Sequence, residues 1–350
     1  MRLRRLLYRI TLCLIALCLL PCSALGGEAY TPSRETKCGH ENCYWTTPMD
    51  IRDERAIWAM LLSPVTVLKG GQKEQVYLLN QPNGDAVGEI TCASQSVHVL
   101  GEDQNGWTQV ETYSSSFHDS KTKNWNGLAR GWVETERLAT VTPASAFGMV
   151  ADKLTQRLYV FKEGKLFATL RISTGLSNER QPYNETRSGE FLLVSPVGDF
   201  LSDNLLCEKA LRFNNGDLLH QVPKIKSSNN YASFEAKLGQ RASHGCIRVQ
   251  RQRTPEGVNM SWLWAKYENN VKLVVWEDWP GRVPPPAPAG LMLYHNPKKG
   301  RNYHTGEVCY GVRKEYQPMQ PLPIDRLFEK PYDKLKPCPY CNPPLRENMQ

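Results

Sequence analysis

Short apolar stretches alternate with polar turns between residues 60 and 141. Stretches such as QVYLLN, GEITCA and WTQVET are separated by turn residues at Pro82-Asn83-Gly84, Gln104-Asn105-Gly106 and Gly131. Several short strands with turn signals at regular spacing are typical of a small all-β domain. The pattern therefore predicts a small barrel here. A second β-rich region follows it and ends on the apolar strand VKLVV at 271–275.

Within the second region, Ser243-His244-Gly245-Cys246-Ile247-Arg248 places a cysteine on a glycine-flanked turn. A tight turn permitted by Gly245 exposes the sulfur, and nearby cations such as Arg248 lower the pKa of a thiol. The pattern predicts a reactive thiolate at Cys246. The alternative is an ordinary buried thiol on a strand, because free cysteines are frequently buried.

A cysteine nucleophile needs a histidine base that is close in space and separated in sequence. Among the seven histidines, His220 follows the apolar pair Leu218-Leu219, as on a strand edge facing a site. His244 lies on the cysteine turn itself, whereas a distant histidine is free to approach the sulfur. His220 is therefore the predicted base, and a strand-end histidine with only a structural role is the alternative.

His220 followed by SHGCIR resembles the active-site signature of the L,D-transpeptidase (YkuD-type) domain. The segment from Ala151 to Gly175 is similar to that domain's opening hairpin, with a Glu163-Gly164 turn and a return strand ending Ser173-Thr174-Gly175. The resemblance covers residues 144–277 and implies a β-sandwich-like catalytic domain.

The chain departs from the family's pattern at two places. TRSGEFLLVS, from Thr186 to Ser195, is similar to the family's Thr-Pro-x-Gly-x-Phe segment, but Arg187 replaces the usual proline. The spacing from His220 to Ser243 is longer than in the family, so an insertion around 224–237 is expected to form a loop over the cleft. Substrate choice is therefore less transferable than catalysis.

The resemblance implies acyl transfer on peptidoglycan stem peptides without a catalytic cofactor. Cys246 would attack a tetrapeptide donor, expel the terminal D-alanine and form a thioester, which an amine would resolve into a 3-3 cross-link. His220 would take the thiol proton, with its imidazole oriented by the backbone carbonyl of Gln221. Backbone N–H groups of Gly245 and Cys246 would form the oxyanion hole.

The same resemblance assigns Ser243, His244 and Arg248 to substrate binding. An arginine suits this role because its planar guanidinium binds a carboxylate through two hydrogen bonds. The alternative for Arg248 is a surface salt bridge. Water could also replace the amine as acceptor, which would make the protein an L,D-carboxypeptidase, and a noncatalytic cell-wall-binding protein is the third reading.

The predicted barrel at 60–141 is similar to a bacterial SH3-type domain, with Asn105-Gly106-Trp107 before one strand and Gly131-Trp132-Val133 opening the last. This resemblance implies binding to wall peptides, which would raise the effective concentration of substrate near Cys246. The alternative is a spacer barrel in which Trp107 and Trp132 belong to the core.

The first 26 residues predict a secretory signal peptide. Four arginines precede an apolar run from Ile10 to Leu20, and Ala24-Leu25-Gly26 supplies a small-x-small cleavage site. The run is short for a membrane span, although an uncleaved anchor is an alternative and would be the only membrane contact. Cys22 after a lipobox-like leucine suggests lipidation, which Pro21 disfavours. The protein is expected to be exported to the periplasm or cell envelope.

Export affects how the net charge and the cysteines of the chain are interpreted. The whole chain carries a formal net charge of +8, from 43 basic and 35 acidic residues; without the four leader arginines the surface is only mildly basic, so nucleic-acid binding is not indicated. In an oxidising compartment cysteines form disulfides. Within the N-terminal segment 27–59, Cys38 and Cys43 are expected to pair, and a metal site that includes His40 is the alternative.

A proline-rich linker at 278–290 precedes a Cys/His-rich tail at 291–350. His304, Cys309 and the Cys338-Pro-Tyr-Cys341 knuckle offer one nitrogen and three sulfur ligands, the set of a structural zinc site. A tail with few apolar residues needs such a staple. The alternative is a disulfide from Cys309 to one of the other two cysteines, and His295 is a spare ligand. A weak likeness to the zinc module of the Ada repair protein carries no DNA-binding expectation.

Overall fold

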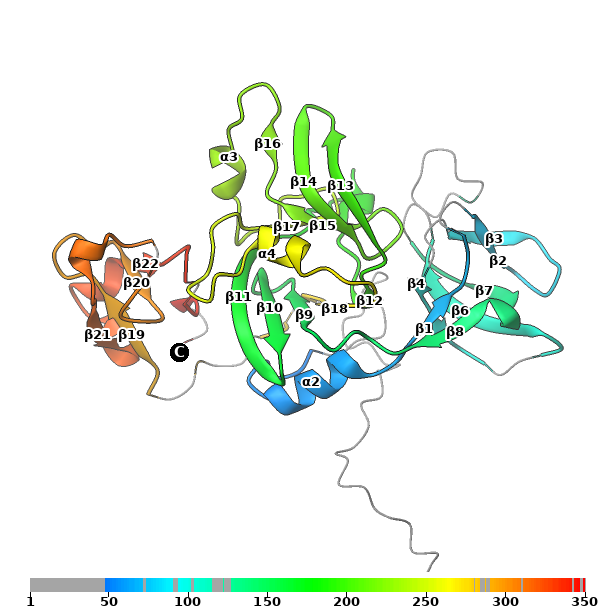
Figure 1. Cartoon of the computed structure of the whole chain (residues 1–350), viewed down its shortest axis with the longest axis horizontal. Coiled ribbons are helices and arrows are strands. Elements are labelled where there is room, and N and C mark those ends of the chain that lie inside the picture. The colour runs from blue at the N-terminus through cyan, green and yellow to red at the C-terminus, as the bar shows by residue number, and fades with distance from the viewer. Residues whose placement is uncertain are drawn as a thin grey trace, which may run out of the picture. The chain divides into compact units, whose positions relative to one another are not determined.

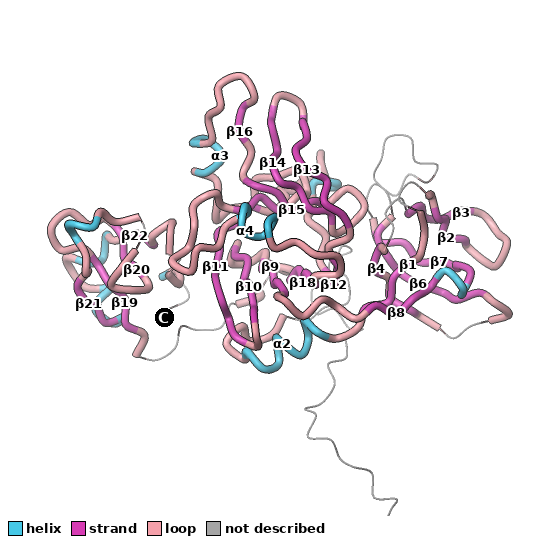
Figure 2. Tube along the Cα trace, in the orientation of Figure 1, coloured by secondary structure: helices cyan, strands magenta, loops and turns pink. Residues whose placement is uncertain are grey.

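The computed structural model describes residues 48–71, 74–90, 94–101, 104–114, 122, 127–279, 281–283, 287, 290–309, 311–341, 343–346 and 349. The predicted signal peptide, the Cys38–Cys43 pair and part of the proline-rich linker lie outside these residues. Strands dominate the described chain and its helices are short, so the fold class is mainly β, as predicted (Figures 1 and 2). No helix within the described ranges is long and apolar enough to cross a membrane.

The first described element is helix α2 (Glu54–Leu62). Asp53 caps its N-terminus, because the Asp53 carboxylate accepts a hydrogen bond of 3.0 Å from the backbone N–H of Ala56. Its buried residues are Ile57, Met60 and Leu61, and they face the sheet that later carries the candidate active site.

Two antiparallel sheets follow, where the sequence predicted a barrel. The strand orders are β4-β1-β8 and β3-β2-β7-β6-β5. The strands are β1 (Val65–Leu68), β2 (Val76–Leu79), β3 (Ala86–Ile90), β4 (Gln95–Ser96), β5 (His98–Val99), β6 (Trp107–Tyr113), β7 (Leu128–Glu134) and β8 (Leu138–Val141), with the 3₁₀ turn η1 (Thr135–Arg137) before the last. Two of the predicted turns are present, since Asn83, Asn105 and Gly106 have positive φ angles of 57°, 57° and 85°. The predicted turn at Gly131 is wrong, because Gly131 lies inside β7 and pairs with Val110. That the module is SH3-like stays a prediction.

Alternation along β6 and β7 places the two tryptophans away from the core of this module. Val110 and Val133 are fully buried in its core, whereas Trp107 and Trp132 are only partly buried. Because Gln109 pairs with Trp132 and Trp107 pairs with Glu134, the two indoles lie on the other face as diagonal neighbours. The interpretation of both tryptophans as core residues is wrong.

The largest sheet has ten strands, in the order β12-β18-β9-β10-β11-β17-β15-β14-β13, with β16 added on β14. Its strands are β9 (Gly148–Asp152), β10 (Arg157–Lys162), β11 (Lys165–Ser173), β12 (Gly189–Leu192), β13 (Ser195–Ser202), β14 (Leu205–Arg212), β15 (Leu218–Gln221), β16 (Lys224–Ile225), β17 (Ile247–Val249) and β18 (Lys272–Trp276). The predicted opening hairpin is confirmed as β10 and β11, joined by Glu163 and Gly164 at φ angles of 53° and 77°.

This sheet surrounds one large apolar core that includes residues from most of its strands, among them Leu158, Phe191, Leu219, Ile247 and Leu273. Helix α4 (Met260–Ala265) adds Met260 and Leu263 to it and begins at Asn259, whose side chain accepts from the N–H of Trp262. The 3₁₀ turn η2 (Pro182–Asn184) precedes β12. The predicted insertion after His220 contains β16 and helix α3 (Ala232–Glu235).

The C-terminal module has its own four-stranded sheet, in the order β21-β19-β20-β22. Its elements are β19 (Met292–His295), β20 (Asn302–His304), η3 (Lys314–Tyr316), β21 (Gln320–Pro323), η4 (Ile324–Phe328), η5 (Tyr332–Lys334) and β22 (Lys336–Pro337). Its apolar core is small, formed by Leu293, Tyr303, Leu322 and Leu327.

Candidate active site

Strand pairing brings the predicted nucleophile and base to one face of the sheet. Strands β15 and β17 run parallel, with His220 opposite Arg248. Side chains alternate along a strand, so Cys246, two residues before Arg248, shares the face of His220. Leu219 and Ile247 point to the other face, into the apolar core. Burial of Leu219 and Ile247 in the core therefore fixes the register of the two strands, and this register places Cys246 and His220 on the same face.

The hydrogen bond of His220 determines its tautomer. Its Nδ1 lies 2.6 Å from the backbone oxygen of Gln221. A carbonyl oxygen only accepts, so Nδ1 carries the proton, and in the neutral ring Nε2 is left as an acceptor. Burial lowers the pKa of His220 to about 4. The imidazole is therefore neutral near pH 7 and able to take a proton. Phe200 packs edge-on against it, at 5.8 Å between ring centroids.

The thiol of Cys246 departs from the sequence expectation. Burial raises its pKa to about 12; Asp217 raises it as well, while a backbone hydrogen bond from Leu218 and the charge of Arg248 lower it only in part. The prediction that nearby cations produce a resting thiolate is thus wrong in direction, because desolvation outweighs them. A thiol in this setting depends on a neighbouring base for activation.

The turn that carries Cys246 is held by hydrogen bonds from a neighbouring loop. Gly245 has a φ of +118°, a conformation open to glycine. The Thr186 hydroxyl donates to the Gly245 carbonyl oxygen at 2.5 Å and accepts from the Gly175 N–H at 2.8 Å. A Cβ at Gly245 would approach an oxygen of Asp217 to 3.1 Å. Sequence reasoning noted the TRSGEF segment, but not this role of its threonine.

Ser243 shapes the turn from within. Its hydroxyl donates to the Cys246 carbonyl oxygen at 2.5 Å and accepts, at the longer distance of 3.3 Å, from the Gly245 N–H. The Gly245 N–H predicted for the oxyanion hole therefore has a weak partner already. The substrate-binding role of Ser243 and the oxyanion role of Gly245 stay predictions.

The other two predicted substrate-binding residues differ in exposure. His244 is exposed, while Arg248 is buried, with 8% of its surface accessible. Arg248 donates to the Ala242 carbonyl oxygen at 2.9 Å and stacks over Phe234 at 5.6 Å. The alternative of a surface salt bridge is wrong for Arg248. Phe234 belongs to α3, so the insertion reaches this part of the site.

A buried charge network supports the loop that bears Thr186, and sequence reasoning missed it. Lys153 is fully buried and pairs with Glu185 at 2.6 Å and with Glu277 at 2.7 Å. Arg241 joins Glu185 at 3.0 Å and also Asp278. Burial alone would raise the pKa of Glu185, but the charges of Lys153 and Arg241 lower it. The only signal in the sequence was the position of Arg241 next to the cysteine signature.

Arg187, which stands where the family has proline, is buried within this loop. It donates to the backbone oxygen of Tyr183 at 3.1 Å and to that of Glu185. It also lowers the pKa of the buried Asp217, which burial raises on balance. Two further hydrogen bonds to carbonyl oxygens thus tie the loop down, where a proline would restrict it covalently.

Glu208 on β14 connects the base strand to the insertion. Its carboxylate accepts from the side chain of Gln221 at 2.8 Å, from Lys224 at 3.2 Å and from Tyr231 at 2.5 Å. Gln221 is therefore held at both ends, since its backbone oxygen also accepts from His220. No periodicity in the sequence indicated this link.

The four predicted metal ligands of the C-terminal module come together. The donor atoms of His304, Cys309, Cys338 and Cys341 lie within 4.8 Å of one another, and all four residues are buried. They form a group that could hold a metal ion. His295 is buried too, but it is outside this group.

Comparisons with known proteins find relatives of the region that contains Cys246 and His220. Residues 147–275 match the family model of the L,D-transpeptidase catalytic domain (YkuD). A protein of Bacillus subtilis (strain 168) named "Putative L,D-transpeptidase YciB" is 27% identical over 125 residues, which are 34% of this chain and 60% of that protein. The chain thus spans less than two thirds of this relative.

Solved structures of L,D-transpeptidases are similar at low identity. One from Stackebrandtia nassauensis is 20% identical, with 40% of this chain and 60% of that chain covered and a TM-score of 0.29. One from Mycobacterium smegmatis is 13% identical, with 60% and 99% covered and a TM-score of 0.30. These scores are too low to support more than the resemblance itself. The family match and the curated relative support an L,D-transpeptidase catalytic domain within this chain, at residues 147–275.

Proposed function

We propose that this protein is an exported cysteine L,D-transpeptidase that acts on peptidoglycan stem peptides. The observation that carries the proposal is the hydrogen bond from the Nδ1–H of His220 to the Gln221 carbonyl oxygen. His220 lies on β15, which pairs with β17, the strand that directly follows Cys246. The hydrogen bond leaves Nε2 as the acceptor on the face that Cys246 shares. The YkuD match and the arginine-rich, apolar leader support the activity and the export, respectively.

The first half-reaction forms a thioester. His220 Nε2 takes the proton of the Cys246 thiol as the sulfur attacks the carbonyl carbon of the donor's L-centre. The tetrahedral intermediate collapses with loss of D-alanine, whose amine takes that proton from His220. Backbone N–H groups of the Cys246 turn stabilise the oxyanion, and each such donor contributes about 3 kcal/mol to lowering the barrier.

The second half-reaction transfers the acyl group. An amine of a neighbouring stem attacks the thioester and gives its proton to His220, and the sulfur leaves as the thiol, so the enzyme returns to its starting state. The product is a 3-3 cross-link or another amide. Water in place of the amine would give the L,D-carboxypeptidase product. His244 is exposed on the turn, and its proposed role is to contact the donor or the acceptor.

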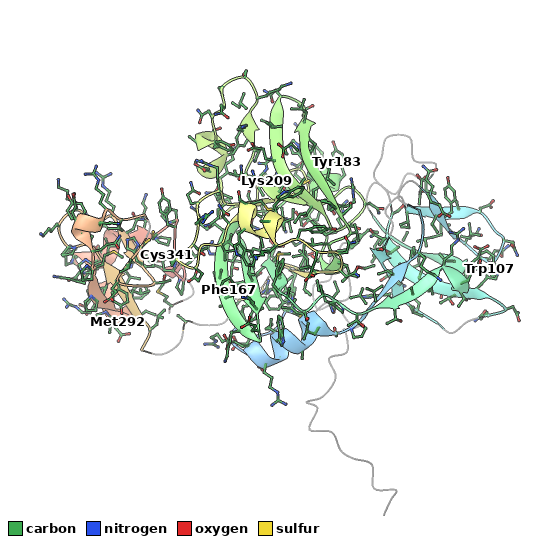
Figure 3. The ribbon with its side chains drawn as sticks, in the orientation of Figure 1. Trp107, Phe167, Tyr183, Lys209, Met292 and Cys341 are labelled. Carbon is green, nitrogen blue, oxygen red and sulfur yellow. The ribbon has the colours of Figure 1, made fainter. Side chains whose placement is uncertain are left out.

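The N-terminal module is proposed to hold the wall polymer. Support comes from Trp107 and Trp132, which lie as neighbours on the face opposite to the core, and Figure 3 shows Trp107 on this module. Aromatic rings with one exposed side are frequent in binding surfaces. Such binding would raise the local concentration of stem peptides around Cys246.

The test is mass spectrometry of products after incubation of the mature protein with purified disaccharide-tetrapeptide. A dimer with loss of one D-alanine supports transpeptidation, and a monomeric tripeptide supports carboxypeptidation. Cys246→Ala serves as the matched control. If wild type and Cys246→Ala both leave the tetrapeptide intact, while the wild-type thiol is shown to be free, the enzymatic proposal is overturned in favour of a noncatalytic wall-binding protein.

A further inference from the structure

The Cys/His group of the C-terminal module is outside the chemistry proposed for Cys246. His304 ends β20, Cys309 lies in the loop after it, and Cys338 and Cys341 follow β22. The parallel pairing of β20 with β22, with Tyr303 opposite Pro337, brings the two halves of the group together across 29 residues or more. Figure 3 shows Cys341 among the side chains of this module. The fold itself therefore assembles the group.

The distances within the group match a metal-centred tetrahedron. Cys309 Sγ and Cys338 Sγ are 3.7 Å apart, and Cys341 Sγ is 3.5 Å from His304 Nδ1. Zinc bonds of about 2.3 Å to sulfur and about 2.0 Å to nitrogen, at tetrahedral angles, place two sulfurs about 3.8 Å apart and a sulfur and a nitrogen about 3.5 Å apart. All four donor atoms lie within 4.8 Å of one another, so a shift of about 1 Å in the wider pairs lets one central ion bond all four.

We propose that His304, Cys309, Cys338 and Cys341 bind one structural zinc ion. Three thiolates and one imidazole are a ligand set that zinc prefers, and a site closed by four protein ligands has no open position for a catalytic water. The disulfide alternative uses two sulfurs and leaves the third cysteine and the inward-facing imidazole nitrogen without a function. The ion holds the module together and takes no part in acyl transfer.

The surroundings of the sulfurs fit thiolate ligands. The backbone N–H of Thr305 points to Cys341 Sγ at 3.4 Å, and that of Tyr340 points to Cys338 Sγ at 3.4 Å. Such donors stabilise the negative charge that a thiolate keeps when it binds a metal. Gln317 donates to the Cys309 carbonyl oxygen at 2.7 Å and so fixes the loop that presents the third sulfur.

The module needs this contribution to its stability. Its larger apolar cluster has four fully or nearly fully buried members, and the other is made of the three cysteines with Met319. Three of the eight buried members of the two clusters are thus proposed metal ligands. A small unit with so few apolar residues draws much of its folding free energy from the ion.

A cavity gives the ion a way in. It has a volume of about 360 Å³ and is lined by His304 and Cys338 together with Tyr316, Tyr340 and Arg301. Two of the four ligands therefore border the cavity. A chelator is expected to remove the ion slowly, without first unfolding the whole chain.

The experiment uses the full mature chain purified without chelator. Elemental analysis of the wild type should find one zinc per chain, and exchange with Co²⁺ should give sulfur-to-cobalt charge-transfer bands with intense d–d bands of a tetrahedral ion. Cys338→Ser should lose the metal and the bands. Cys207→Ser, a buried cysteine of β14, is the matched control and should keep both.

A second variant covers the case in which Cys338→Ser fails to fold. His304→Cys retains four ligands and should still bind Co²⁺, with bands shifted to the pattern of four thiolates. Wild-type protein that carries neither zinc nor cobalt overturns the proposal, as does a mapped disulfide between Cys309 and Cys338 or Cys341. Metal content that is equal in wild type and Cys338→Ser does so too. None of these results depends on transpeptidase activity.

Discussion

At Cys246, favourable neighbours and burial shift the pKa of the thiol in opposite directions. Arg248 and a backbone hydrogen bond favour the thiolate, yet desolvation raises the pKa of the thiol to about 12. His220 is neutral because burial lowers its pKa to about 4. The resting pair is therefore a neutral thiol and a neutral imidazole, and proton transfer between them accompanies the attack.

Replacing Cys246 by alanine removes the nucleophile and little volume. We expect release of D-alanine from tetrapeptide to fall to background, while the melting temperature stays within a few degrees of wild type, because the change removes a single sulfur atom and little packing volume. Coupled detection of D-alanine and circular dichroism measure the two effects. Turnover near the wild-type rate in this variant would refute the mechanism.

The low pKa of His220 predicts an unusual acid limb. Because the pKa of His220 is lowered to about 4, its imidazole stays neutral as the pH falls from 7. We therefore expect kcat/KM to stay constant down to about pH 4 and then to drop by about tenfold per pH unit as His220 is protonated. The measurement is kcat/KM between pH 3.5 and 8, with circular dichroism at each pH to exclude unfolding. An apparent pKa near 6.5 would contradict the burial of this imidazole.

At the scale of elements, two features arrange the site: the parallel pairing of β15 with β17, and the loop before β12. The pairing sets which residues face one another. Thr186 of this loop fixes the turn that carries Cys246. The loop itself is held by buried ion pairs of Glu185 with Lys153 and Arg241. Turn geometry thus depends on residues about 60 positions upstream of Cys246.

Thr186→Val keeps the side chain's shape and removes its hydroxyl. The Gly245 carbonyl and the Gly175 N–H then lose their partner, at a cost of about 1–3 kcal/mol for each buried group. We expect kcat to fall more than KM rises, because the turn proposed to stabilise the oxyanion moves. Thr186→Ser retains the hydroxyl and should restore most of kcat. Equal losses in both variants would show that the hydroxyl is not what positions the turn.

At the scale of the molecule, buried polar contacts join the N-terminal elements to the large sheet. Lys272 on β18 is fully buried, pairs with Glu190 at 2.6 Å and donates to the backbone oxygens of Met60 and Ser63 at 2.8 and 3.1 Å. Tyr113 of β6 donates to the Ser188 carbonyl oxygen at 2.7 Å. The end of α2 and strand β18 are thus joined by buried hydrogen bonds.

Lys272→Met should destabilise the fold by about 3–5 kcal/mol, because it leaves the Glu190 carboxylate buried without its cation. The double variant with Glu190→Gln should recover part of the loss, since no charge then remains. Urea unfolding followed by fluorescence gives the two free energies. Additive losses in the double variant would show that the two side chains are not coupled.

The sequence by itself determined the elements and the chemistry. Alternating apolar residues and turn residues predicted the β10–β11 hairpin and the turns at Asn83 and Asn105, and residue types with spacing predicted Cys246, His220 and the four Cys/His ligands. These signals are local, because periodicity and turn propensity act over a few residues.

Only the tertiary structure decided the environment of those residues. Burial reversed the expected pKa shift of Cys246, ruled out the alternative of a surface salt bridge at Arg248 and placed Trp107 and Trp132 outside the core. Tertiary packing also paired Lys153 with Glu185 and Glu277, and Thr186 with Gly245. These residues are too far apart in the sequence for any periodicity to indicate the pairs. Desolvation and long-range hydrogen bonds depend on which segments pack together, so they emerge only when the chain is folded.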